Sequence, residues 1–130
     1  MYKFSRSSQE RLASCDERIQ RVCKRVIMIK DFTVLEGTRS QERQEQLFSQ
    51  GKSKLQWPNS KHNTTPSLAI DIAPYPIDWH DLAEFRYLAG LMVGTGHEMG
   101  IALRWGGDWN MNGALSDNRF NDLPHFELIN

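Results

Sequence analysis

The segment LAIDIAPYP, residues 68–76, is the feature of this sequence that most constrains its fold. Apolar residues alternate with other residues, and this period of two predicts an extended strand with two different faces. The apolar face consists of Leu68, Ile70 and Ile72. The opposite face carries Asp71 between two alanines, so its carboxylate has open space in front of it. Asp71 is therefore either a solvent-facing strand residue or part of a site.

Three further stretches predict helices. Over residues 8–28 apolar residues recur at spacings of three and four, which predicts one amphipathic helix that packs by a single stripe. Residues 38–51 begin with cap-type residues, continue with good helix formers and end at a glycine, so they predict a short helix. A third helix begins near Asp78 and turns its apolar residues inward as far as Met99.

Short strands complete the expected fold. DFTVLEG, IALRW and HFELI predict strands at residues 31–37, 101–105 and 125–129. Helices and strands are mixed without a regular βαβ alternation. We therefore expect an α+β fold, with a small, mostly antiparallel sheet packed against about three helices in a single domain, residues 1–130.

The composition excludes several classes of function. Charged residues make up 25% and apolar residues 39%, as in ordinary globular domains. Sixteen basic side chains balance sixteen acidic ones, so no overall positive field favours nucleic acid. The apolar runs are too short to span a bilayer, and the first residues lack the apolar core of a secretory signal. We expect a monomer made in the cytoplasm that does not insert into membranes and reaches any target outside by a separate route.

Two histidines and a carboxylate form a candidate metal set. His125 alone, in the apolar segment DLPHFELIN, is as easily explained as a packed core residue. Zinc hydrolases, however, commonly use three ligands from His, Asp or Glu and leave a fourth position for water. His62, Asp71 and His125 are a set of this composition, although their spacing alone does not establish a site.

Three segments, SKHNTTPSLAID, RWGGDW and DLPHFEL, resemble the M15-type zinc peptidases. That family includes D-alanyl-D-alanine carboxypeptidases and dipeptidases and the L-alanyl-D-glutamate endopeptidases of phage lysis. Its pattern places Ser, His, Ala and Asp in one segment and a carboxylate three residues before a late histidine. In this chain the pattern falls on Ser60, His62, Ala69, Asp71, Asp122 and His125. The resemblance covers residues 37–128 and leaves the helix at 8–28 as packing support.

The resemblance implies one zinc ion per chain, held by His62, Asp71 and His125, and hydrolysis of a peptide bond in the peptidoglycan stem peptide. One departure is that eight residues separate His62 from Asp71, two more than in the family pattern. The extra pair lies in a loop that contains Pro66. We expect this loop to bulge outward without moving the ligands.

Other residues receive roles from the same resemblance. Asp122 is the candidate general base, and Glu127, on the face of His125, is either a partner of that histidine or an alternative base. Arg39 stabilises developing negative charge or holds a substrate carboxylate, unless it is an exposed arginine at a helix start. Ser60 is a candidate substrate-binding residue. Trp105 and Trp109 are expected to form an apolar wall for the substrate, unless they pack in the core. Because Pro124 follows, we expect Asp122 to lie in a turn.

The segment DWNMNGALSDNR has a weaker resemblance to a calcium-binding loop. Its side chains match the first half of an EF-hand pattern, but position twelve is Arg119 instead of glutamate. The candidate calcium ligands are Asp108, Asn110, Asn112 and Asp117. An ordinary polar turn explains the same residues.

Several functions fit these observations. The leading hypothesis is a phage lysis enzyme, an L-alanyl-D-glutamate endopeptidase. A D-alanyl-D-alanine carboxypeptidase or dipeptidase of the same fold would cut nearer the end of the stem peptide. A zinc-retaining but catalytically silent wall-binding module, and a phage component that cuts the wall during entry, are further alternatives.

Overall fold

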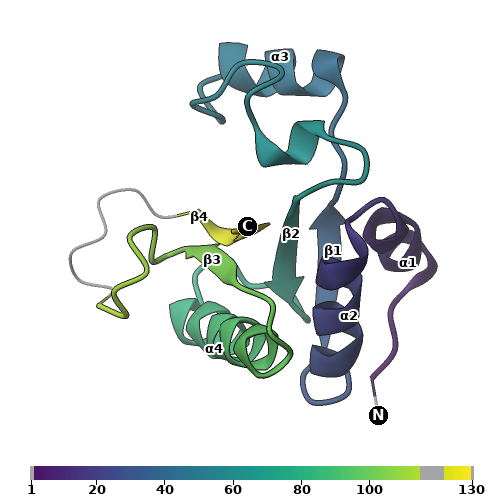
Figure 1. Ribbon diagram of the computed structural model, residues 1–130, viewed down its shortest axis with the longest axis vertical. Helices are drawn as coiled ribbons and strands as arrows, with labels where there is room; N and C mark the ends of the chain where they lie inside the picture. Colours follow the sequence, from purple (N-terminus) through teal and green to yellow (C-terminus); the bar gives the residue numbers. More distant parts are fainter. Residues whose placement is uncertain (1, 115–121, 130) are drawn as a thin grey trace.

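A computed structural model describes residues 2–114 and 122–129, which form a four-stranded antiparallel sheet with helices packed around it (Figure 1). The strands lie in the order β1-β2-β4-β3, and every neighbouring pair is antiparallel. The α+β class is therefore confirmed. In chain order the elements are α1 (Arg6–Ala13), α2 (Glu17–Val26), β1 (Phe32–Glu36), α3 (Gln41–Ser49), the 3-10 helix η1 (Lys61–Asn63), β2 (Ala69–Pro74), α4 (Leu82–Glu98), β3 (Leu103–Gly106) and β4 (Asp122–Leu128).

The prediction of one continuous helix over residues 8–28 is wrong, because the chain breaks between α1 and α2. Asp16 caps α2 by accepting a hydrogen bond from the backbone N–H of Arg18. Between the helices, Cys15 forms an isolated bridge with Ser67, and the backbone N–H of Asp16 donates to the carbonyl of Ser67 at 2.8 Å. The described residues therefore contain four α-helices instead of about three.

The core lies between one face of the sheet and helices α2 and α4. The apolar face predicted for β2 is confirmed, since Ile70 and Ile72 are fully buried. The predicted stripe on the second helix is also confirmed, because Ile19, Val22 and Val26 have no exposed surface. No helix within residues 2–114 and 122–129 has the length and apolarity needed to cross a membrane.

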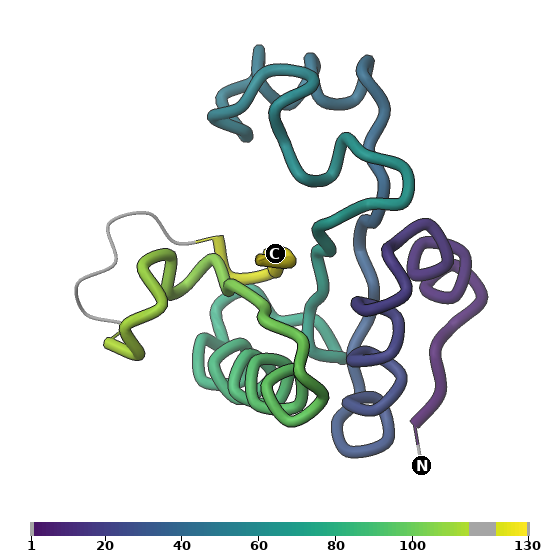
Figure 2. Tube along the Cα trace, viewed as in Figure 1, coloured from purple at the N-terminus to yellow at the C-terminus, as the bar shows by residue number. Residues whose placement is uncertain are grey.

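The segment from α3 to η1 extends beyond the sheet, past the end of β1 and the start of β2 (Figure 2). Residues 64–68, which include the two additional residues, return from η1 to β2 and contact the α1–α2 junction. Ser67 makes backbone hydrogen bonds to both Ser14 and Asp16 there. The longer loop is thus held against the helices, and His62 before the loop contacts Asp71 after it.

Candidate metal centre

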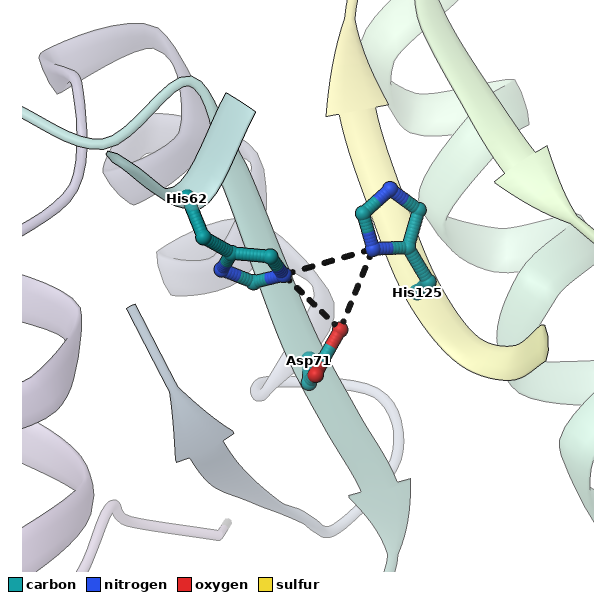
Figure 3. Close-up of side chains that lie close together, drawn as sticks. All are labelled: His62, Asp71 and His125. Atoms are coloured by element: carbon teal, nitrogen blue, oxygen red, sulfur yellow. Dashed lines mark hydrogen bonds and ion pairs between the residues drawn. The ribbon is translucent and has the colours of Figure 1, made fainter. Parts of the chain in front are cut away.

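His62, Asp71 and His125 converge, although they come from three separate elements (Figure 3). Asp71 on β2 lies directly opposite His125 on β4, so the sheet register places the two side chains on one face. His62 reaches them from η1. Its Nε2 lies 3.2 Å from Oδ1 of Asp71 and 3.3 Å from Nδ1 of His125, and that Nδ1 lies 3.2 Å from the same oxygen.

These separations fit a tetrahedral zinc site. Zinc bonds of about 2.0–2.1 Å at tetrahedral angles place two ligand atoms roughly 3.3 Å apart. The three observed separations are 3.2, 3.2 and 3.3 Å. Two imidazoles and one carboxylate are also a donor set that zinc hydrolases use. The three residues therefore fit a zinc ion.

Both imidazoles are oriented by acceptors on their far nitrogens. Nδ1 of His62 lies 2.7 Å from the carbonyl oxygen of Gly37. Nε2 of His125 lies 2.8 Å from Oε1 of Glu127. Such contacts fix the proton on the outer nitrogen and leave the inner nitrogen free to bind a metal. Glu127 is itself held by Arg104 at 2.7 Å and Lys61 at 3.5 Å, both through its other oxygen.

The local sequence explains why His62 points inward. Ser60 begins η1 with a capping box, in which its hydroxyl accepts from the backbone N–H of His62 while its own N–H donates to the side chain of Asn63. Ser60 lines the cavity but is only 6% exposed. The structure therefore gives Ser60 a role in orienting His62. Its role in substrate binding stays a prediction.

Arg39 is not an exposed arginine, since its side chain is 9% exposed. Its guanidinium contacts Glu36 at 2.9 Å, Gln44 at 2.9 Å and Oδ2 of Asp71 at 3.6 Å. Oδ2 is the Asp71 oxygen that faces away from the two histidines. Arg39 therefore borders the cluster and holds the carboxylate from behind, while Nε of Arg39 is buried without a hydrogen-bond partner among the described residues.

Gln44 is a site residue that sequence reasoning missed. It is fully buried in α3, and its amide oxygen accepts from Arg39 at 2.9 Å and Asn63 at 3.1 Å. Its amide nitrogen donates to the Ser53 hydroxyl at 2.9 Å and the Leu55 carbonyl at 2.6 Å. Gln44 thus connects the arginine, the loop after α3 and the η1 turn. Its sequence signal was weak, because α3 contains other glutamines and only its spacing from buried Leu47 distinguishes it.

Burial and hydrogen bonding together determine the pKa values in the cluster. Burial disfavours the Asp71 carboxylate, but hydrogen bonds from His125 and His62 outweigh it and hold the pKa well below its usual range. Burial lowers the pKa of His125, but hydrogen bonds to Asp71 and Glu127 outweigh that effect and raise it to about 9. Burial raises the pKa of Glu127, but hydrogen bonds from His125 and Arg104 bring it down to about 2. The carboxylates therefore favour positive charge at their centre, as a metal ion would supply.

Asp122 differs from the other carboxylates. Burial raises its pKa, and the negative charge of Asp71 raises it further. It lies at the start of β4, opposite Gly106, so the predicted turn at Asp122 is wrong. A side chain on Gly106 would clash with the Asp122 backbone, since an added Cβ would lie 2.0 Å from its carbonyl oxygen. The close approach of β3 fits this extended part of β4, and Pro124 favours the same extended backbone at Leu123.

A cavity of about 570 Å³ opens over the cluster and is lined by His62, Asp71, His125, Asp122 and Arg39 together with parts of α3, the loop after it and β3. Trp109 also lines this cavity, with its ring centroid 5.4 Å from that of His125. Trp105 does not. It is buried against Phe126, and its indole N–H donates to the carbonyl of Leu123. The expected substrate wall is therefore wrong for Trp105, because its side chain belongs to the core face of β3.

In the candidate calcium loop two side chains accept local hydrogen bonds, while Oδ1 of Asp108 is buried without a hydrogen-bond partner among the described residues. The Asp108 carboxylate accepts from the backbone N–H of Gly113 at 2.9 Å, and the Asn110 side chain accepts from the N–H of Asn112 at 3.2 Å. Asp117 lies outside the described residues. These contacts are those of a polar turn, and calcium binding stays a prediction.

Comparisons with known proteins agree with this geometry. Residues 1–129 match the family described as phage L-alanyl-D-glutamate peptidase. The L-alanyl-D-glutamate peptidase of Escherichia phage T5 is 38% identical over 137 aligned positions that cover 98% of each chain. The crystal structure of the L-Ala D-Glu endopeptidase ChiX of Serratia marcescens matches with a TM-score of 0.78 at 26% identity, over 98% of this chain and 90% of that one. The chain therefore belongs to the phage L-alanyl-D-glutamate peptidase family.

Proposed function

We propose that this protein is a zinc-dependent peptidoglycan hydrolase that cleaves the bond between L-alanine and D-glutamate in the stem peptide and acts in phage lysis. Family membership and the activity named for both relatives support the bond. The observation that carries the metal assignment is the set of three ligand-atom separations of 3.2–3.3 Å at the floor of a cavity.

The residues around the cavity have different roles in the proposed reaction. A zinc ion bound by His62, Asp71 and His125 would polarise the scissile carbonyl and lower the pKa of a water molecule. Asp122 accepts the proton of the attacking water and passes it to the leaving amine, which its raised pKa favours. The guanidinium of Arg39 holds Asp71 in place and adds positive charge beside the developing oxyanion.

Glu127 is the weaker candidate for the base. One of its oxygens contacts His125, and the other contacts Arg104 and Lys61. Burial raises the pKa of Glu127, but hydrogen bonds from His125 and Arg104 outweigh burial and lower it to about 2. Glu127 is therefore a poor proton acceptor near neutral pH. We assign the orientation of His125 to Glu127. Proton transfer is assigned to Asp122.

Digestion of purified cell-wall sacculi tests the reaction. Protein loaded with zinc should release stem peptides with a new N-terminal D-glutamate, detected by mass spectrometry, and a chelator should stop the release. Loss of a terminal D-alanine alone would assign the protein to the carboxypeptidases instead. Zinc binding with no cleavage of any wall substrate would show a silent binding module.

Metal content tests the ligands separately from activity. His125→Ala should bind less than one zinc per chain, whereas His97→Ala, a change of an exposed histidine on α4, should keep full occupancy. Zinc should also raise the melting temperature of the wild type, because its ligands are assembled only in the folded state. Full zinc occupancy in His125→Ala would refute the ligand assignment.

A further inference from the structure

The cavity over the metal cluster has an uneven distribution of charge. Six cationic side chains line it, namely Arg39, Arg43, Lys52, Lys54, Lys61 and Arg104, against four carboxylates. On the side formed by the sheet, the charges are matched. Glu127 forms ion pairs with Arg104 and Lys61. Asp71 contacts the two histidines through one oxygen and Arg39 through the other.

On the side formed by α3, positive charge is in excess. Glu36 is shared between two guanidiniums, with Oε1 2.9 Å from Arg39 and Oε2 3.3 Å from Arg43. Arg43 donates its hydrogen bond to Glu36 through Nε, and its side chain is 51% exposed. Among the described residues, the terminal nitrogens of Arg43 make no hydrogen bond. Its planar N–H groups are therefore available to an incoming anion.

Lys52 adds a second cation on a well-anchored loop. Its backbone N–H donates to the carbonyl of Leu47 at 2.9 Å, and buried Gln44 holds the next turns through Ser53 and Leu55. The Lys52 ammonium has no carboxylate within 4.0 Å in residues 2–114 and 122–129. The backbone of the loop is therefore held in place, and the ammonium of Lys52 is available to an incoming anion.

Arg43 and Lys52 line the same cavity as the metal cluster. A chain of ion pairs runs from Asp71 to Arg39, from Arg39 to Glu36 and from Glu36 to Arg43. The α3 side of the cavity therefore borders the metal cluster through Arg39.

We propose that Arg43 and Lys52 bind the free carboxylate of the D-glutamate residue of the substrate, an inference that rests on the proposed function. The nitrogen of D-glutamate belongs to the scissile amide, and one of its two carboxyl groups continues the peptide. The other carboxyl group stays free, two to four bonds from the scissile nitrogen, and is anionic near neutral pH unless it is amidated. The enzyme thereby distinguishes stem peptides that carry a free carboxylate from those that carry a carboxamide.

Two synthetic stem peptides that differ only in this group, carboxylate or carboxamide, provide the test. Wild-type protein should cleave the carboxylate peptide with a kcat/KM on the order of tenfold higher, mainly through a lower KM, because the carboxylate gains charge-assisted hydrogen bonds. The preference should weaken as ionic strength rises. Arg43→Gln and Lys52→Gln should each reduce it, and the double variant should abolish it.

Lys24→Gln is the matched control, because Lys24 is an exposed lysine on α2 outside the cavity lining. Equal kcat/KM for the two peptides in the wild type, or a preference kept by the double variant, would overturn the carboxylate subsite while the proposed function stands. If neither peptide is cleaved, the proposed function fails. The subsite is then judged by calorimetric binding of both peptides to the zinc-loaded wild type and double variant, where equal affinities overturn it.

Discussion

Replacement of Gln44 by methionine should loosen the whole α3 side of the cavity. The side chain is fully buried and makes four hydrogen bonds, to Arg39, Asn63, Ser53 and Leu55. Methionine keeps the approximate volume of glutamine but none of these bonds, so the effect of polar contacts is separated from that of a cavity. The Leu55 carbonyl and the Arg39 Nη1 lose their closest partners.

The magnitude follows from those orphaned groups. A buried polar group left without a partner costs about 1–3 kcal/mol, and partial access to water from the cavity reduces the sum to about 2–4 kcal/mol. For a chain of this length, a loss of that size corresponds to a melting temperature lowered by about 7–15 °C. The kcat/KM should also fall more than tenfold at a temperature where the variant is folded, since Arg39 and the loop after α3 lose a common anchor.

Thermal unfolding of the metal-free protein and peptide cleavage by the zinc-loaded protein provide the assays. Gln46→Met is the matched control, because Gln46 lies exposed on the same helix, and its melting temperature should change by less than about 2 °C. If Gln44→Met unfolds no earlier than Gln46→Met, the network has no energetic importance and the reasoning is refuted.

Four further substitutions test other parts of the structure. Arg39→Lys should keep the fold but lose at least about tenfold in kcat/KM, since an ammonium cannot replace the planar fork; wild-type turnover would contradict a role in the reaction. Asp122→Asn should keep zinc and lose roughly 10²–10⁴-fold in rate, and Glu127→Gln should lose much less; the reverse order would show the base to be misassigned. Asp16→Ala should lower the free energy of unfolding by about 0.5–2 kcal/mol near neutral pH. Side-chain and backbone hydrogen bonds from Arg18 lower the folded-state pKa of Asp16. The stabilisation is therefore present above the unfolded-state pKa of about 3.9 and disappears as pH falls through the folded-state pKa. A difference in stability that does not change with pH would show that the charge of Asp16 has no part in it.

Local patterns predicted much of the fold because they depend on neighbours in the chain. The alternation in residues 68–76 identified β2 and placed Ile70 and Asp71 on opposite faces, as the structure shows. The same kind of pattern failed at residues 8–28. The apolar spacing continued across Cys15, and the break there is stabilised by backbone hydrogen bonds with Ser67, which lies far along the sequence.

The sequence by itself determined which residues are available for the metal centre, since ligand chemistry and motif order depend only on residue type and position. It thus indicated His62, Asp71 and His125 as a set. Only the tertiary structure decided their distances, because the register of β2 against β4 and the capping of η1 place the three ligand atoms 3.2–3.3 Å apart. It also decided that Trp109 faces the cavity while Trp105 is in the core, and that buried Gln44 links α3 to Arg39. These outcomes depend on contacts between segments distant in sequence, which no local pattern encodes.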